Sequence, residues 1–211
     1  MMIRFWNAFV KITGWPVQWV CFRTRVCYQN KAVQGRRIQG PAIVVCNHTS
    51  VFDYVVLLFV FFGRTLRVQM AELQFEKPFL GRLLKRLGGI RVDRNSHDFR
   101  FVAQSEDILR KGGVVGVFPE SRLPRPEEER PLPFKSSVAY LALSAGVPVI
   151  PVYTNGSYFQ KKHASVVIGE PMEAAALTDP SLSEKENLER VAAAFRERVI
   201  ALGKELETYE K

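Results

Sequence analysis

Hydrophobic residues fall into short runs separated by polar turns along most of the chain, a pattern that predicts alternating strands and helices. The run 42–46 is short and rich in β-branched residues, as expected for a buried strand, whereas the apolar run 55–62 is long enough to begin a helix. Further strands are predicted at 65–69, 90–92, 114–118, 147–153 and 165–168, and further helices at 78–87, 96–111 and 136–145. This alternation predicts an α/β fold in which helices flank a mixed sheet.

The last stretch of the chain has a different pattern. From residue 183 onward, apolar residues recur at steps of three and four, at Leu188, Val191, Phe195, Val199, Leu202 and Leu206. That spacing is typical of one face of a long amphipathic helix. We interpret the stripe as packing against the core or a partner, with no chemistry of its own.

The first forty residues hold two aromatic-rich segments, which are separated at residues 14–16. The candidates for membrane contact are the aromatic side chains of Trp6, Trp15, Trp19 and Phe22. The longest uncharged run, 12–22, is shorter than the roughly 20 residues that span a bilayer. Aromatic residues with flanking Lys and Arg suit an amphipathic helix pair that lies on anionic headgroups. We therefore predict a membrane-surface helix pair over 1–37 and a separate domain over 38–211.

Charge supports this interpretation of the N-terminal segment. The chain has a formal net charge of +9, and residues 1–40 contain no Asp or Glu. Their basic residues are Arg4, Lys11, Arg23, Arg25, Lys31, Arg36 and Arg37. A basic arm also suits nucleic acid, but three Trp with few polar side chains to contact bases favour lipid. The remaining alternatives are two ordinary helices packed on the domain, or a secretory signal, which Lys11 and Pro16 disfavour by interrupting the apolar core.

Composition excludes several other classes of protein. With 211 residues and 47% hydrophobic content, the chain can bury a substantial core. The three cysteines, Cys21, Cys27 and Cys46, are odd in number and lack Cys-x2-Cys spacing, so we predict reduced thiols in a cytosolic setting, without disulfides or a metal. No phosphate-binding Gly-x4-Gly-Lys-Ser/Thr or Gly-x-Gly-x-x-Gly motif occurs, which disfavours a nucleotide-driven enzyme.

The strongest candidate for chemistry is His48, at the turn between the predicted strand 42–46 and the helix that follows. Ligands gather at the carboxyl ends of strands in α/β sheets. Asp53 lies five residues further on, and two helical positions with that spacing are about 140° apart around the axis. If the two side chains interact, His48 must lie in the turn while Asp53 reaches back from the first helical turn, as in a base held by an acidic orienter. Alternatively, Ser50 and Asp53 form a capping pair.

Basic residues provide a second pattern. Arg94 and Arg122 follow predicted strand ends, and Lys135 precedes a predicted helix. Cations converging on the edge that holds His48 would clamp a phosphate group, with Arg offering a bidentate fork. The alternative is that Arg94 and Arg122 form surface ion pairs with Asp93 and Glu120.

Four segments, in order, resemble the motifs of the glycerolipid acyltransferases, and in particular the bacterial 1-acyl-sn-glycerol-3-phosphate acyltransferases. These segments are 47–53 (Asn-His-Thr-Ser-Val-Phe-Asp), 88–94 (Gly-Gly-Ile-Arg-Val-Asp-Arg), 117–122 (Val-Phe-Pro-Glu-Ser-Arg) and 147–152 (Val-Pro-Val-Ile-Pro-Val). The later Gly-x-Pro of the family is matched at 169–171. The resemblance covers about residues 40 to 170 and makes 38–211 an acyltransferase domain.

The resemblance implies transfer of a fatty acyl group from acyl carrier protein or coenzyme A to the sn-2 hydroxyl of lysophosphatidic acid, forming phosphatidic acid in phospholipid biosynthesis. It implies that His48 is the general base, that Asp53 orients it, and that Arg94 and Arg122 bind the acceptor phosphate while Glu120 organises that clamp. An imidazole, with an unperturbed pKa of about 6.5, suits removal of a hydroxyl proton. Main-chain donors at the start of the following helix are candidates to hold the oxyanion. No cofactor is consumed.

The segment around Glu120 departs from the family pattern. Ser121 and Ser137 stand where the family usually has Gly, and Ser121 would be strained if its position requires a positive φ. Arg91 replaces a residue that is usually hydrophobic.

Taken together, the motifs and the N-terminal segment predict a peripheral acyltransferase at the cytoplasmic face of the membrane. Its rivals are an acyltransferase for another lyso-lipid and a catalytically silent lipid-binding protein, which the intact His48 and Asp53 disfavour.

Overall fold

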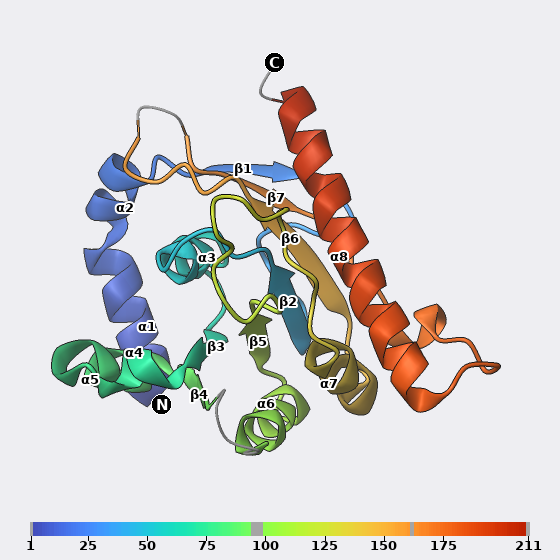
Figure 1. The fold of residues 1–211 in the computed structure, drawn as a ribbon. Coiled ribbons are helices and arrows are strands. Elements are labelled where there is room, and N and C mark those ends of the chain that lie inside the picture. The colour runs from blue at the N-terminus through green and yellow to red at the C-terminus, as the bar shows by residue number, and fades with distance from the viewer. Residues whose placement is uncertain (1, 94–98, 161–162, 210–211) are drawn as a thin grey trace.

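The computed structural model describes residues 2–93, 99–160 and 163–209 and contains one seven-stranded sheet (Figure 1). The strands are β1 (Arg25–Tyr28), β2 (Ala42–Cys46), β3 (Leu66–Ala71), β4 (Ile90–Val92), β5 (Val114–Val117), β6 (Val149–Thr154) and β7 (Ser165–Ile168). Their order is β1-β7-β6-β2-β5-β3-β4. Strands β2 to β6 run parallel, whereas β7 pairs antiparallel with β6 and parallel with β1. The predicted mixed α/β sheet is thus confirmed.

The helices cover both faces of this sheet. They are α1 (Met2–Thr13), α2 (Trp15–Cys21), α3 (Asp53–Val60), α4 (Glu72–Glu76), α5 (Pro78–Leu87), α6 (Arg100–Arg110), α7 (Ser137–Ala145) and α8 (Glu184–Tyr209), with a 3₁₀ turn η1 at Ala174–Leu177. In β2, Ala42, Val44 and Cys46 belong to the core cluster that includes α3 and α5. The alternate residues Ile43 and Val45 belong to the cluster with α6, α7 and α8. A strand buried on both faces explains the unbroken apolar run in the sequence.

Most predicted elements occur within a few residues of their expected bounds. The C-terminal stripe forms one 26-residue helix, α8, and its apolar residues pack into the core. The helix predicted from residue 96 begins at Arg100 within the described residues. The prediction from sequence missed β1, α4 and η1, which have only four or five residues each and therefore show little periodicity.

The N-terminal helix pair is present, but two of its expected surface residues are buried. Phe22 is only 5% exposed, so the prediction that it contacts a membrane is wrong. Lys11 is 3% exposed, and its ammonium donates to main-chain carbonyls rather than facing headgroups. Both face inward because α1 and α2 pack on α3 and α5. Strand β1 lies within the segment 1–37 and pairs with β7, so the sheet begins before residue 38.

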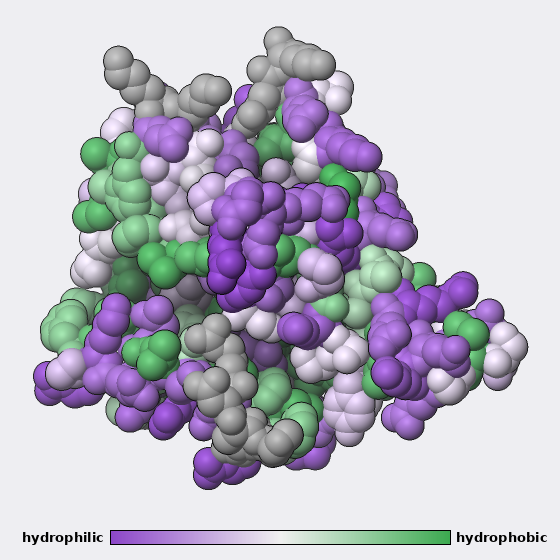
Figure 2. Space-filling view, viewed as in Figure 1, coloured by the Kyte–Doolittle hydropathy of each residue, from purple (hydrophilic) through white to green (hydrophobic). Residues whose placement is uncertain are grey.

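The outer side of this helix pair is apolar. Its exposed large hydrophobic residues are Met2, Phe5, Phe9, Ile12, Trp15, Val17, Trp19 and Val20, whereas Trp6 is half-buried beneath the Arg86 guanidinium at 4.8 Å from its ring centroid. Hydrophobic residues gather over α2 and the adjoining part of α1 on the left side of Figure 2. Within the described residues, every helix is either too short or too polar to cross a bilayer.

Candidate active site

His48 and Asp53 meet at the turn between β2 and α3. The Nδ1 atom of His48 lies 2.8 Å from Oδ2 of Asp53, which is the first residue of α3. Asp53 is fully buried, whereas the His48 side chain is 20% exposed and its ring stacks on Phe118 with centroids 4.6 Å apart. The pairing geometry expected from their spacing is therefore present, with the histidine at the surface and the carboxylate beneath it.

Five hydrogen bonds hold the Asp53 carboxylate. Its Oδ2 accepts from His48 and from the main-chain N–H groups of Thr49 (2.7 Å) and Ser50 (2.9 Å). Its Oδ1 accepts from the Thr49 hydroxyl (2.8 Å) and from the Tyr158 hydroxyl (2.6 Å). Asp53 thus orders the turn as the capping alternative supposed, and it contacts His48 at the same time. The two interpretations of this residue describe one arrangement.

This arrangement fixes the state of the imidazole. An ionised carboxylate only accepts hydrogen bonds, so the proton of a neutral His48 lies on Nδ1, facing Asp53. The lone pair then lies on Nε2, on the far side of the ring. A histidine held in this tautomer by a buried carboxylate can take a proton from a hydroxyl group at Nε2.

Glu120 fixes the main chain of the same turn. Its Oε1 accepts from the His48 N–H at 2.6 Å, and its Oε2 accepts from the Leu132 N–H at 2.8 Å. Burial raises the pKa of Glu120, although both main-chain hydrogen bonds oppose that shift. Glu120 follows β5, the neighbour of β2 in the sheet, and it is 3% exposed. The Glu120 carboxylate therefore links the main chain of the His48 turn to that of the loop at Leu132, and these two hydrogen bonds do not involve Arg122.

Strand β6 supports the turn from the other side. The amide side chain of Asn47 donates to the Thr154 carbonyl (2.9 Å) and accepts from its N–H (2.8 Å). This pair extends the contact between β2 and β6 by one residue. Gly156, at φ +67°, packs so closely on Thr49 that an added Cβ would lie 2.5 Å from the Thr49 hydroxyl oxygen.

Tyr158 is a site residue that the sequence reading missed. Its hydroxyl donates to Asp53, and it lies 3.0 Å from the Thr154 hydroxyl. Burial raises the pKa of Tyr158, as does the nearby charge of Asp53, so the phenol keeps its proton. The available signal was its position just after the strand at 147–153, because carboxyl ends of parallel strands share one edge of a sheet.

The main-chain donors proposed to hold an oxyanion are already engaged. The N–H groups of Thr49 and Ser50 bond to Asp53, that of Phe52 bonds to the Ser50 hydroxyl, and that of Asp53 bonds to the Ser50 carbonyl. The sequence-based expectation that these donors face a substrate is therefore wrong for these four groups. Their partners are internal because a buried carboxylate needs several donors.

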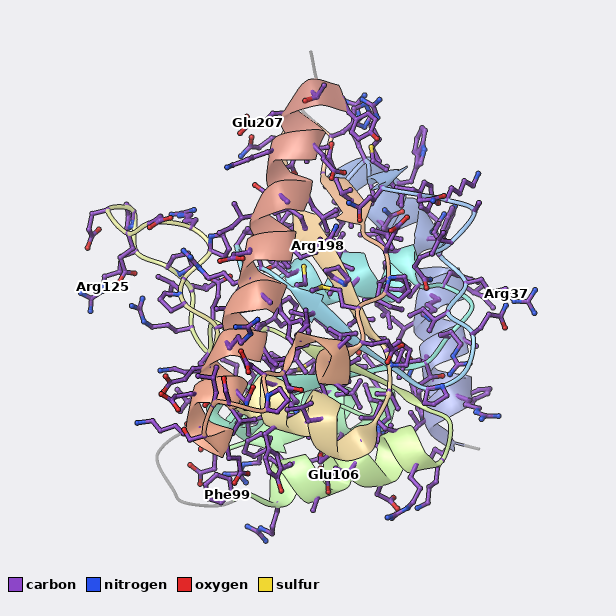
Figure 3. All side chains as sticks on the ribbon, turned by 90° about the vertical axis from the view of Figure 1, so that its right-hand side faces the viewer. Arg37, Phe99, Glu106, Arg125, Arg198 and Glu207 are labelled. Atoms are coloured by element: carbon purple, nitrogen blue, oxygen red, sulfur yellow. The ribbon has the colours of Figure 1, made fainter. Side chains whose placement is uncertain are left out.

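Arg122 lies on an exposed loop between β5 and α7. Its guanidinium forms a bidentate ion pair with Glu128, with Nη1 and Nη2 at 2.7 and 2.6 Å from the two carboxylate oxygens. This pair lowers the pKa of Glu128 to about 2. The loop projects from the body of the domain, with Arg125 at its outer part in Figure 3. Among the described residues, the Arg122 fork therefore pairs with Glu128 and not with Glu120, the partner that the ion-pair alternative expected.

The other predicted phosphate ligands are less closely tied to this site. Lys135 has an exposed side chain, and its N–H donates to the Pro119 carbonyl at 3.0 Å, beside Glu120. Arg94 lies outside the described residues. Ser121 has a φ of +64°, so the position that the family fills with glycine does require the left-handed region, and serine there is strained.

The sequence profile of the family described as Acyltransferase matches residues 25–155. The chain belongs to the acyltransferase family. This acyltransferase is 24% identical over 170 residues to a 1-acyl-sn-glycerol-3-phosphate acyltransferase of Bacillus subtilis, covering 78% of the chain and 82% of that relative. It is 34% identical over 157 residues to the human 1-acyl-sn-glycerol-3-phosphate acyltransferase beta, covering 71% of the chain and 54% of the human protein.

A solved structure shares the fold. The crystal structure of the 1-acyl-sn-glycerophosphate (LPA) acyltransferase PlsC from Thermotoga maritima superposes on this acyltransferase with a TM-score of 0.67 and 22% sequence identity. The superposition covers 93% of the present chain and 79% of the other. The resemblance drawn from the four sequence motifs is thereby confirmed at the level of family and fold.

Proposed function

We propose that the protein transfers a fatty acyl group from a thioester, carried by acyl carrier protein or coenzyme A, to the sn-2 hydroxyl of 1-acyl-sn-glycerol-3-phosphate. The product is phosphatidic acid, a precursor in phospholipid biosynthesis. The observation that carries the proposal is the 2.8 Å contact between His48 Nδ1 and buried Asp53, which leaves Nε2 available as a base. The names of the relatives from Bacillus subtilis and human support this choice of acceptor.

In the proposed mechanism, His48 Nε2 removes the proton of the acceptor hydroxyl as its oxygen attacks the thioester carbonyl. Asp53 stabilises the resulting imidazolium and keeps the ring in place. The tetrahedral intermediate collapses, the carbon–sulfur bond breaks, and the thiolate takes the proton from His48. Glu120 and Tyr158 act through their hydrogen bonds, one to the His48 main chain and the other to Asp53. No step requires a cofactor.

We propose that Arg122, Lys135 and Arg94 bind the acceptor phosphate. Arg122 can do so only if its fork exchanges Glu128 for the phosphate, and the exposure of both side chains makes that exchange inexpensive. A phosphate monoester offers the same bidentate geometry as a carboxylate, with more negative charge. The exchange involves the exposed loop, while the hydrogen bonds of the His48 turn stay as they are.

We further propose that α1 and α2 seat the protein on the cytoplasmic face of the membrane. The supporting observation is the row Met2, Phe5, Phe9 and Ile12, which shares one side of α1 and is 48–67% exposed. Trp15 and Trp19 extend that surface along α2. Aromatic side chains at such a surface bury apolar area in the headgroup region, which holds a peripheral protein against its lipid substrate.

The test offers purified protein a radiolabelled acyl thioester on either carrier, together with lysophosphatidic acid or head-group-bearing lysophospholipids, and identifies the products by chromatography. We expect labelled phosphatidic acid with wild-type protein. Product formation only from the head-group-bearing lysophospholipids would establish the rival acceptor, and no product from any acceptor would favour the silent lipid-binding protein.

A matched pair of variants on one loop tests the phosphate site. Arg122→Gln should raise the KM for lysophosphatidic acid about tenfold or more while changing the KM for the acyl donor little. Arg125→Gln, from the same loop but without a side-chain contact to Glu128 in the described residues, serves as the control. Equal effects of the two variants, or an equal effect of Arg122→Gln on both substrates, would remove Arg122 from the acceptor site.

A further inference from the structure

A cavity of about 990 Å³ lies at the edge of the sheet opposite His48. Its lining comes from α1, from residues 62–67 before and at the start of β3, and from residues 107–113 before β5. His48 and Glu120 follow the carboxyl ends of β2 and β5, whereas this cavity adjoins the amino ends of β3 and β5. Because these strands are parallel, the cavity and the proposed catalytic site lie at different edges of the molecule.

The lining of the cavity carries an excess of positive charge. Its basic residues are Arg4, Lys11, Arg64, Arg67 and Lys111, and among the described residues that line it only Asp107 has a carboxylate. Asp107 already accepts hydrogen bonds from Arg110 and Lys111, at 2.7 and 2.6 Å. The charge of Asp107 also acts on Arg67. One carboxylate against five cations nevertheless leaves the described lining with an excess of positive charge.

Main-chain carbonyls hold three of these cations without neutralising them. The Lys11 ammonium donates to the carbonyls of Phe61, Phe62 and Arg64 at 3.2, 2.9 and 2.6 Å. Arg64 donates to two carbonyls and Arg67 to one. Burial lowers the pKa of Lys11 to about 8, which reflects the cost of its unpaired charge. An anion in the cavity would reduce that cost.

An apolar track leads from the cavity toward the outer side of the helix pair. Ile12 and Phe62 line both the first cavity and a neighbouring one of about 530 Å³, whose lining also includes Trp15. All three side chains are between 43% and 67% exposed. The first cavity is thus cationic, and the surface beside it is suited to hydrocarbon, so the site matches a ligand that has an anionic head and an apolar tail.

We propose that this cavity binds the phosphate group of an anionic membrane phospholipid, with an acyl chain along Ile12, Trp15 and Phe62. A free phosphate would use the cations but not the apolar track, and a zwitterionic phospholipid would bring a positive choline group to a positive lining. The lipid at this site is bound, not acylated, because it lies at the edge opposite His48. The proposal does not depend on the acyl transfer reaction.

The experiment uses the full-length His48→Ala variant without any acyl thioester, so no acyl transfer can occur and the outcome is independent of the proposed reaction. Short-chain phosphatidylglycerol, below its micelle concentration, is titrated and binding is measured by calorimetry. We expect saturable binding of one lipid per protein, about tenfold tighter than binding of short-chain phosphatidylcholine or inorganic phosphate. Equal binding of phosphatidylglycerol and inorganic phosphate would reduce the site to an anion site and overturn the lipid proposal, as would the absence of saturation.

Variants then locate the site. Arg67→Gln should weaken phosphatidylglycerol binding about tenfold, and exposed Arg4→Gln, which leaves the fold unaffected, should weaken it several-fold. Ile12→Ser should weaken lipid binding while leaving phosphate binding unchanged. The controls are Arg82→Gln, an exposed cation on α5 that does not line the cavity, and Arg122→Gln at the other edge. Equal losses in the controls would mean diffuse attraction to a basic surface and would overturn the proposal.

Discussion

The two ends of helix α3 are both held by charged groups, but in opposite ways. At the N-terminus, the carboxylate of Asp53 accepts five hydrogen bonds from four residues. At the C-terminus, Lys11 donates to the carbonyls of Phe61, Phe62 and Arg64, while Arg36 donates to those of Phe59 and Val60. Negative charge at a helix N-terminus and positive charge at a C-terminus both suit the helix dipole.

The two ends of α3 differ in which group remains available to interact with another molecule. Around Asp53, the donors converge from the His48 turn and from the loop after β6, so the carboxylate has one geometry and the free position is Nε2 of His48. Around Lys11, only neutral carbonyls accept, so positive charge remains beside a cavity. In the functions that we propose, one end of α3 presents a base to a substrate, and the other end receives an anion.

After replacement of His48, the largest loss of kcat is expected from replacement of Asp53. Asp53→Asn should lower kcat by about 10² to 10⁴, because an amide cannot stabilise the imidazolium and favours the wrong tautomer. The variant should also unfold at a lower temperature, since its NH₂ group would face donors from Thr49, Ser50 or Tyr158. Steady-state kinetics and calorimetry measure the two effects. A loss of stability with normal kcat would leave Asp53 a purely structural cap.

The next largest loss of kcat is expected from Tyr158, whose hydroxyl donates to Asp53 from the loop after β6. Tyr158→Phe should reduce kcat about tenfold with little change in either KM, because one charge-assisted hydrogen bond is lost. Without this donor, the carboxylate is less firmly positioned behind the His48 ring. Tyr140→Phe, on the exposed face of α7, is the control. An unchanged kcat in Tyr158→Phe would leave the tyrosine a packing residue.

A smaller effect is expected from the glycine that packs on Thr49. Both Gly156 and Gly146 have positive φ, but an added Cβ would clash with Thr49 at Gly156 and meet nothing within 4 Å at Gly146. Gly146→Ala should therefore cost only the backbone strain, about 1 to 2 kcal/mol of unfolding free energy. Gly156→Ala should cost more and should also lower kcat. If Gly156→Ala and Gly146→Ala lost equal stability and kcat stayed unchanged, the position of Thr49 would not affect catalysis.

The smallest effect is a pH dependence at the other end of α3. Burial lowers the pKa of Lys11 to about 8, below its usual 10.5, so between these values the unfolded chain binds more protons than the folded one. The unfolding free energy of the wild type should therefore rise between about pH 8 and pH 10 relative to that of Lys11→Met. Urea denaturation at several pH values measures this difference. Parallel pH dependences of the two proteins would mean that Lys11 keeps its ordinary affinity for protons.

Local spacing showed how His48 and Asp53 could pair across a single strand-to-helix turn, but it left the Ser50–Asp53 capping pair as an alternative until the motif resemblance was added. The contributions of Glu120 and Tyr158 depend instead on the order of the strands, which places β5 and β6 on either side of β2. Sequence alone does not give that order. It also misassigned Phe22 and Lys11, because an amphipathic segment shows that two faces exist and not which residues at their boundary turn inward.

The most direct test of the account is the rate of acyl transfer by His48→Ala. With labelled acyl thioester and lysophosphatidic acid, this variant should lose about 10² to 10⁴ of the wild-type kcat, because it lacks the group that we propose accepts the hydroxyl proton. Its circular dichroism and unfolding temperature should stay near those of the wild type, since the side chain is partly exposed and makes one side-chain hydrogen bond among the described residues. A folded His48→Ala protein that transfers the acyl group at a near-normal rate would contradict the account.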